Sequence, residues 1–99
     1  MLKHHHAYTN GVRLHYVEQG TGPLVLLCHG WPESWYSWRH QIDALANAGY
    51  RVVAPDQRGY GTSDAPHAVD AYGILDLVGD LVGLVHALGE EKAIIVGHD

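Results

Sequence analysis

The 99-residue sequence has one cysteine, no phenylalanine and no long apolar run. A lone Cys28 cannot form an internal disulfide, which is typical of a reducing compartment and predicts a cytoplasmic location. The longest apolar run, Leu24 to Cys28, has five residues, whereas a membrane-spanning helix needs about 20. We therefore expect no membrane segment. The N-terminus also lacks the apolar stretch of a secretory signal.

Basic residues are scarce too, with six Lys and Arg against eleven Asp and Glu and a net charge of −5. Nucleic-acid binding depends on neutralising phosphates with Lys and Arg, so we expect no nucleic-acid partner. Apolar residues make up 46% and charged residues 17%, as in an ordinary globular domain. The length allows one domain at most.

Histidine is abundant, with nine residues, and three of them are consecutive at His4, His5 and His6. Neighbours on an extended chain point to opposite faces, so this run does not offer the geometry of a metal site. We interpret it as a solvated leading strand. Cys28 is too isolated for a zinc site, and no phosphate-binding loop is present.

The apolar pattern predicts strands that alternate with helices. The Asn10-Gly11 pair between short apolar segments indicates a hairpin. Three short segments then predict buried strands of a parallel sheet, at Leu24–Cys28, which is apolar at every position, and at 51–55 and 93–96, which are mostly or wholly apolar. Helices join the strands in such a fold, with right-handed crossovers.

Two segments have helical periodicity between these strands. The first begins after Ser34, a suitable N-cap, and ends at Gly49. The second runs from Ala71 to Leu88 with a wide apolar stripe, and Gly89 ends it. The fold class is therefore α/β, with a β-hairpin followed by parallel strands and helical crossovers.

The segments that follow the three predicted strands lie where ligands bind in parallel sheets. They are His29-Gly30-Trp31-Pro32, Asp56-Gln57-Arg58-Gly59 and Gly97-His98-Asp99. In the last, a Gly-x-nucleophile sequence after a buried strand is the first half of a nucleophile elbow, with Asp99 as the nucleophile. A carboxylate suits displacement at an sp³ carbon, such as that of an epoxide or alkyl halide, because it gives an ester that water can hydrolyse.

The segment after the first strand has the features of an oxyanion hole. Gly30 permits close approach by another backbone, and Pro32 restricts Trp31 to an extended conformation. Together they would aim the Trp31 backbone N–H at charge developing on an ester oxygen. A tight turn with a packing tryptophan is the alternative. We interpret His29 as a hydrogen-bonding residue beside the site rather than a general base. The loop after Asp56 we interpret as structural, with an Asp56–Arg58 pair.

Three motifs now stand in order, from His29 to Arg39, from Asp56 to Gly61, and from Gly97 to Asp99. As a set they resemble the N-terminal part of soluble epoxide hydrolases of the α/β-hydrolase fold, over nearly the whole chain. The resemblance implies that Asp99 is the nucleophile, that the Trp31 N–H is an oxyanion-hole donor, and that the Trp31–Pro32 bond is cis. Gly30, Pro32, Gly97 and His98 would shape the site.

The resemblance also implies the reaction. Asp99 opens an epoxide while a pair of cap-domain tyrosines polarises the oxygen, and a histidine with an acidic partner then activates water to release a vicinal diol. No cofactor or metal is required. Residues 1–99 would be the N-terminal part of the core domain, ending at the nucleophile elbow, with the cap domain, the catalytic histidine and the C-terminal part absent. His98, beside the nucleophile, is not assigned the histidine's role.

Two alternatives stay open. Haloacetate and haloalkane dehalogenases share the Asp nucleophile, although haloalkane dehalogenases usually have Asn where this chain has Trp31. The second alternative is a non-catalytic fragment that pairs with a complementary segment. The sheet order implied by the resemblance places Ala93 to Val96 beside Leu24 to Cys28 and leaves its other edge unpaired. An exposed apolar edge requires a partner. We therefore expect the remainder of the same hydrolase as a second chain or segment.

Overall fold

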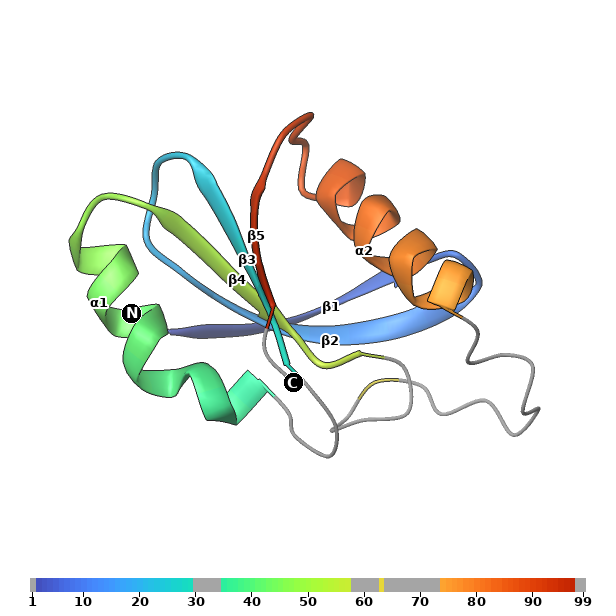
Figure 1. Ribbon diagram of the computed structural model, residues 1–99, viewed down its shortest axis with the longest axis horizontal. Coiled ribbons are helices and arrows are strands. Elements are labelled where there is room, and N and C mark those ends of the chain that lie inside the picture. Colours follow the sequence, from blue (N-terminus) through green and yellow to red (C-terminus); the bar gives the residue numbers. More distant parts are fainter. Residues whose placement is uncertain (1, 30–34, 58–62, 64–73, 98–99) are drawn as a thin grey trace.

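The computed structural model describes residues 2–29, 35–57, 63 and 74–97 of the chain. A five-stranded sheet has the order β1-β2-β4-β3-β5, with helices α1 and α2 on opposite faces (Figure 1). In chain order the elements are β1 (Lys3–Thr9), β2 (Val12–Gln19), β3 (Leu24–Cys28), the 3₁₀-helix η1 (Trp35–Trp38), α1 (Arg39–Asn47), β4 (Arg51–Pro55), α2 (Ile74–Ala87) and β5 (Ile94–Gly97).

The predicted hairpin is confirmed. Strands β1 and β2 are antiparallel, and Thr9 pairs with Val12 so that only Asn10 and Gly11 form the turn. Both turn residues have positive φ, 51° and 81°, which are the signs that a type I′ hairpin turn requires. The His4–His6 run lies in β1, as expected for a leading strand.

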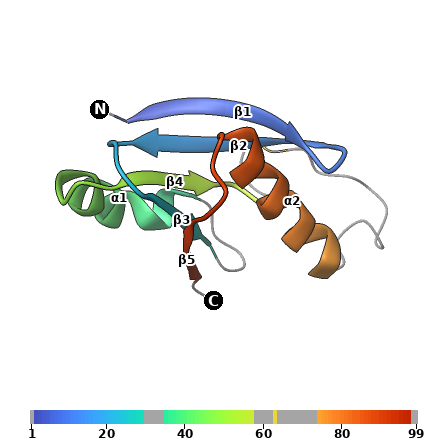
Figure 2. The same cartoon turned by 90° about the horizontal axis from the view of Figure 1, so that it is seen from above.

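The predicted parallel arrangement is also confirmed. Strand β3 pairs in parallel with β4 on one side and with β5 on the other, while β2 pairs with β4 antiparallel. Side chains of β3 alternate between the two faces and are buried on both. The face toward α2 holds the buried cluster Tyr16, Leu24, Leu26, Cys28, Val53 and Leu84. The face toward α1 holds Val17, Val25, Leu27, Ile42, Val52 and Ala54. Figure 2 shows the two helices on either side of the sheet.

The first helix begins differently from the prediction. Residues Trp35–Trp38 form a 3₁₀ turn, and the α-helix starts only at Arg39. The predicted N-cap, Ser34, lies outside the described residues. Ile42 anchors α1 to the sheet with 1% of its surface exposed. Gly49, with φ 96°, follows the helix end as predicted.

Helix α2 packs against the hairpin at two of its glycines, Gly79 and Gly83. A Cβ on Gly83 would lie 1.7 Å from Thr9 Oγ1, so only a glycine fits this position without a shift. The Thr9 hydroxyl donates to the backbone carbonyl of Asp80 at 3.3 Å. Asn10 Nδ2 donates to the Asp80 carboxylate at 3.2 Å. These contacts attach the tip of the hairpin to the helix. Neither described helix is long and apolar enough to cross a membrane.

The prediction that residues 93–96 form a buried strand was wrong in one respect. The strand forms beside β3, but Ile94 is 51% exposed and Ile95 57% exposed. The reason is topological, since β5 is the last strand of the described sheet and has a neighbour on one side only. Its apolar residues match those of a central strand, while its position is that of an edge strand.

Candidate active site

The carboxyl ends of β3, β4 and β5 meet at one edge of the sheet. All three strands are parallel, and Cys28 at the end of β3 is paired with Gly97 at the end of β5. The residues that follow β3 and β4 within the described chain are His29, Asp56 and Gln57, all of them polar. This is the edge at which parallel sheets bind ligands.

His29 is buried, with 5% of its surface exposed, and is joined to the end of β4 by two hydrogen bonds. The Gln57 backbone N–H donates to His29 Nε2 at 3.0 Å, and the Gln57 side-chain amide donates to the His29 carbonyl at 2.7 Å. The lone pair of Nε2 is thus engaged by a backbone donor. In this arrangement His29 fixes the turn after β3 to the turn after β4.

Asp56 is 1% exposed and accepts hydrogen bonds at both carboxylate oxygens. His15 Nδ1 lies 2.8 Å from Oδ2, and the Trp35 backbone N–H donates to Oδ1 at 2.8 Å. Ser63 completes the arrangement, because its hydroxyl donates to the Asp56 carbonyl at 2.5 Å and accepts from the His15 backbone N–H at 2.8 Å. A buried carboxylate is stable only with such partners. The predicted partner, Arg58, lies outside the described residues.

Of the remaining predicted site residues, only Gly97 lies within the described part of the chain. Gly97 is the last described residue of β5, and an added Cβ there would meet no heavy atom within 4 Å. Gly30, Trp31, Pro32, His98 and Asp99 lie outside the described residues. The structure therefore describes the residues from which these two segments leave the sheet, His29 and Gly97.

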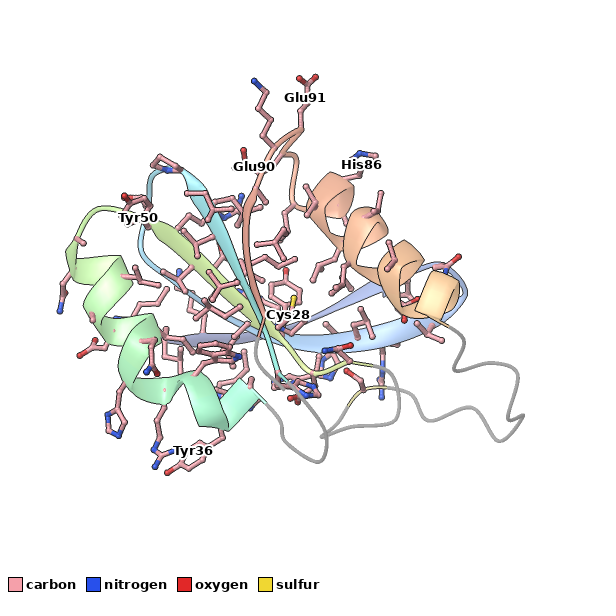
Figure 3. The ribbon with its side chains drawn as sticks, viewed as in Figure 1. Cys28, Tyr36, Tyr50, His86, Glu90 and Glu91 are labelled. Atoms are coloured by element: carbon pink, nitrogen blue, oxygen red, sulfur yellow. The ribbon has the colours of Figure 1, made fainter. Side chains whose placement is uncertain are left out.

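Cys28 is near this edge, yet its chemistry does not suit a nucleophile. Burial raises the pKa of its thiol from 9.0 to about 11, so it is protonated at neutral pH. The reactive form of cysteine is the thiolate. Figure 3 shows its sulfur between the sheet and α2 rather than in the strand-end region. Among the described residues, no group of three His, Cys, Asp or Glu side chains could hold a metal ion.

Comparison with known proteins places this arrangement in a family. Residues 23–99 match the alpha/beta hydrolase fold. The chain belongs to the alpha/beta hydrolase family. The predicted fold class is thereby confirmed, because the hairpin and the parallel strands are those of the N-terminal part of this fold.

Several curated proteins that are similar to this chain are epoxide hydrolases. The chain is 61% identical over 93 residues to epoxide hydrolase A of Mycobacterium tuberculosis, covering 92% of this chain and 29% of that protein. It is 53% identical over 98 residues to epoxide hydrolase 3 of Siraitia grosvenorii, covering 99% and 31%. The chain thus spans about a third of the length of these curated relatives, and its resemblance to epoxide hydrolases is confirmed.

Solved epoxide hydrolases have the same backbone arrangement. The structure of an epoxide hydrolase from an endophytic Streptomyces matches with a TM-score of 0.97 and 63% identity, over 99% of this chain and 30% of that one. An epoxide hydrolase of Vigna radiata matches with a TM-score of 0.97 and 51% identity, over 99% and 31%.

The sequence reasoning missed the contact between His15 and Asp56. These residues are 41 positions apart, and no local pattern joins them. The one available signal is that His15 interrupts an otherwise apolar stretch from Leu14 to Val17, all of which is buried. A buried polar side chain in a strand requires a partner, and a carboxylate at the end of another strand is a natural one.

Proposed function

We propose that this chain supplies the nucleophile, Asp99, and one oxyanion-hole donor, the Trp31 backbone N–H, of an epoxide hydrolase. The observation that carries the proposal is the register of β3 and β5, in which Cys28 is paired with Gly97. The segments that follow these two residues start from adjacent strand ends. The sequences of those segments, together with the similarity to epoxide hydrolases, support their assignment to one site.

The first chemical step is a displacement. A carboxylate oxygen of Asp99 attacks one carbon of the epoxide ring, the C–O bond to that carbon breaks, and the freed oxygen takes a proton from an acid. The resemblance implies two tyrosines of a cap domain for this role. The product is an ester between the substrate and Asp99, which a carboxylate nucleophile forms readily at an sp³ carbon.

Hydrolysis of the ester is the second step. A histidine takes a proton from water, and the oxygen of that water adds to the ester carbonyl carbon. The carbonyl oxygen becomes negatively charged and accepts a hydrogen bond from the Trp31 N–H. Collapse of this intermediate expels the diol oxygen, which takes the proton back from the histidine. The Asp99 carboxyl group, which keeps the second proton of the water, returns it to the acid that protonated the epoxide oxygen in the first step. The vicinal diol leaves, and both the carboxylate and the acid are restored.

Replacement of Asp99 in the complete hydrolase tests the assignment. We expect Asp99→Ala and Asp99→Ser to abolish diol formation from a styrene-type epoxide, while Glu91→Ala, which removes an exposed carboxylate in the loop after α2, leaves it unchanged. Undiminished diol formation by both Asp99 variants would exclude the role. Release of halide from a haloacetate or haloalkane, with no diol from epoxides, would assign the chain to a dehalogenase instead.

We also propose that the remaining part of the hydrolase, as a second chain or segment, pairs with the free edge of β5. The exposure of Ile94 and Ile95 supports this, because an apolar edge strand left open promotes aggregation. Intact mass and gel analysis of the purified material tests the idea, and a single well-behaved species of 10.9 kDa with no companion would exclude it. We further propose that the hydrolase is located in the cytoplasm and that its small-molecule substrate is an epoxide.

A further inference from the structure

A line of hydrogen bonds runs from the first strand to the carboxyl end of β4. His4 Nδ1 lies 3.0 Å from His15 Nε2, and His15 Nδ1 lies 2.8 Å from Asp56 Oδ2. The other carboxylate oxygen of Asp56 accepts from the Trp35 backbone N–H at 2.8 Å. The line therefore links β1 and β2 to the first residue of η1.

The central members of this line are buried and tightly packed. His15 is 6% exposed and Asp56 1%. The ring of His4 stacks on that of His15, with centroids 5.2 Å apart and planes 19° apart, and meets the ring of Trp35 edge-on at 5.4 Å. The buried ring of His15 contacts the rings of both His4 and His6 and has little freedom to reorient, whereas His4 itself is exposed.

The direction of each hydrogen bond in the line follows for an ionised Asp56 and a neutral His15. An ionised Asp56 only accepts hydrogen bonds, so Nδ1 of His15 is the donor to it. In a neutral His15, Nε2 then accepts, and His4 donates from Nδ1. Every bond in the line points toward the Asp56 carboxylate.

The two residues that follow β4 hold both described ends of the segment that carries Trp31. Asp56 binds the backbone of Trp35, which follows that segment, and Gln57 binds the side chain and carbonyl of His29, which precedes it. Residues 30–34 between these two points lie outside the described residues. Their boundaries are set by one short stretch at the end of β4.

We propose that Asp56 and His15 are positioning residues of the active site, which hold the Trp35 backbone at one end of the segment that carries Trp31. The inference rests on the proposed function of Trp31 as an oxyanion-hole donor. A displacement of about 1 Å at a reacting centre can cost about a hundredfold in rate, so the fixing of this segment has a direct effect on turnover.

A conservative variant separates positioning from a general contribution to stability. In Asp56→Asn, the amide oxygen still accepts from the Trp35 N–H, while the amide NH₂ donates to His15 Nδ1. His15 must then carry its proton on Nε2, so its tautomer reverses. In Asp56→Leu, both acceptor oxygens are lost, while the number and branching of the side-chain heavy atoms are kept.

Nuclear magnetic resonance of the complete hydrolase, with ¹⁵N-labelled histidine and tryptophan, tests the structural half of the proposal. We expect the ring ¹⁵N shifts of His15 to show the proton on Nδ1 in the wild type and on Nε2 in Asp56→Asn. The Trp35 amide is expected to keep its slow hydrogen exchange in Asp56→Asn and to lose it in Asp56→Leu. Gln19→Ala, which breaks the exposed hydrogen bond to Asp43, is the control and leaves both signals unchanged.

Kinetics of the complete hydrolase tests the functional half. Asp56→Leu is expected to lower kcat for an epoxide by about 10- to 100-fold with little change in KM, because only a transition-state contact is displaced. Asp56→Asn, which keeps an acceptor for the Trp35 N–H, is expected to retain most of the wild-type kcat. An Asp56→Leu enzyme that is less stable but retains its kcat would overturn the proposal, as would a His15 tautomer that is unchanged in Asp56→Asn. If the wild type forms no diol, the proposed function fails, and the exchange rates of Trp35 still decide whether Asp56 fixes this backbone.

Discussion

Replacement of Gly83 by alanine tests how α2 is attached to the hairpin. Alanine in a helix interior is normally more stable than glycine by about 1 kcal/mol. Here the added Cβ would lie 1.7 Å from Thr9 Oγ1 and 3.1 Å from Thr9 Cβ, and both atoms belong to a short, stiff side chain. The packing cost therefore lowers the free energy of unfolding, whereas the gain in helix propensity raises it.

The contacts set the size of the effect. The Thr9 hydroxyl must turn away, which breaks its bond to the Asp80 carbonyl at a cost of about 1 kcal/mol. Separating helix and hairpin to relieve the remaining contact adds an overpacking cost of about 1–3 kcal/mol. The gain in helix propensity offsets about 1 kcal/mol. We expect Gly83→Ala to lower the free energy of unfolding by about 1–3 kcal/mol.

Urea unfolding followed by tryptophan fluorescence measures this change. Gly79→Ala is the matched control, since its Cβ would meet only the side chain of Asn10, with Nδ2 at 2.8 Å and Cγ at 3.3 Å, and that amide can turn aside at the cost of its bond to Asp80. We expect that variant to change stability by less than about 0.5 kcal/mol, because the helix gain offsets the contact. In a Thr9→Ala background, Gly83→Ala should lose most of its penalty. A Gly83→Ala protein as stable as Gly79→Ala would refute the packing of α2 against β1.

Three further predictions concern other parts of the fold. Arg51→Met removes the bonds from Arg51 to Glu18, Glu90 and the Leu88 carbonyl, at the end of the sheet where Figure 3 shows Glu90. Urea unfolding should show that the free energy of unfolding falls by about 1–2 kcal/mol. The part of this loss that comes from the ion pairs should be smaller in high salt. Gly11→Ala should cost about 1 kcal/mol in the same assay through its φ of 81° alone, because its Cβ would meet nothing within 4 Å; an unchanged midpoint would contradict this. Because folding keeps the Cys28 thiol protonated up to about pH 11, the free energy of unfolding should fall by about 2 kcal/mol as the pH rises from 9 to 11, and Cys28→Ala should remove this part of the fall.

The parts of the fold that sequence could predict are those set by neighbouring residues. Asn10-Gly11 specifies its turn because few other pairs accept positive φ at both positions. The five apolar residues of β3 specify a strand buried on both faces. Gly49 and Gly89 mark the helix ends for the same local reason.

The parts that could not be predicted depend on contacts between distant segments. Thr9 and Gly83 meet only because the hairpin and α2 pack together, and glycine in a helix otherwise indicates nothing but a weak helix former. The bond between Asp56 and His15 joins the end of β4 to strand β2, and the two residues are 41 positions apart in the sequence. The exposure of Ile94 depends on the place of β5 in the sheet, which its own composition does not encode.

A single-turnover reaction of the complete hydrolase in H₂¹⁸O tests the central claim most directly, with enzyme in excess over epoxide and mass spectrometry of both products. If Asp99 forms the ester, the diol keeps an unlabelled oxygen from the carboxylate, and the peptide that contains Asp99 gains one ¹⁸O. A diol that carries ¹⁸O from the first turnover, with an unlabelled Asp99 peptide, would mean that water attacks the epoxide directly and would contradict the account.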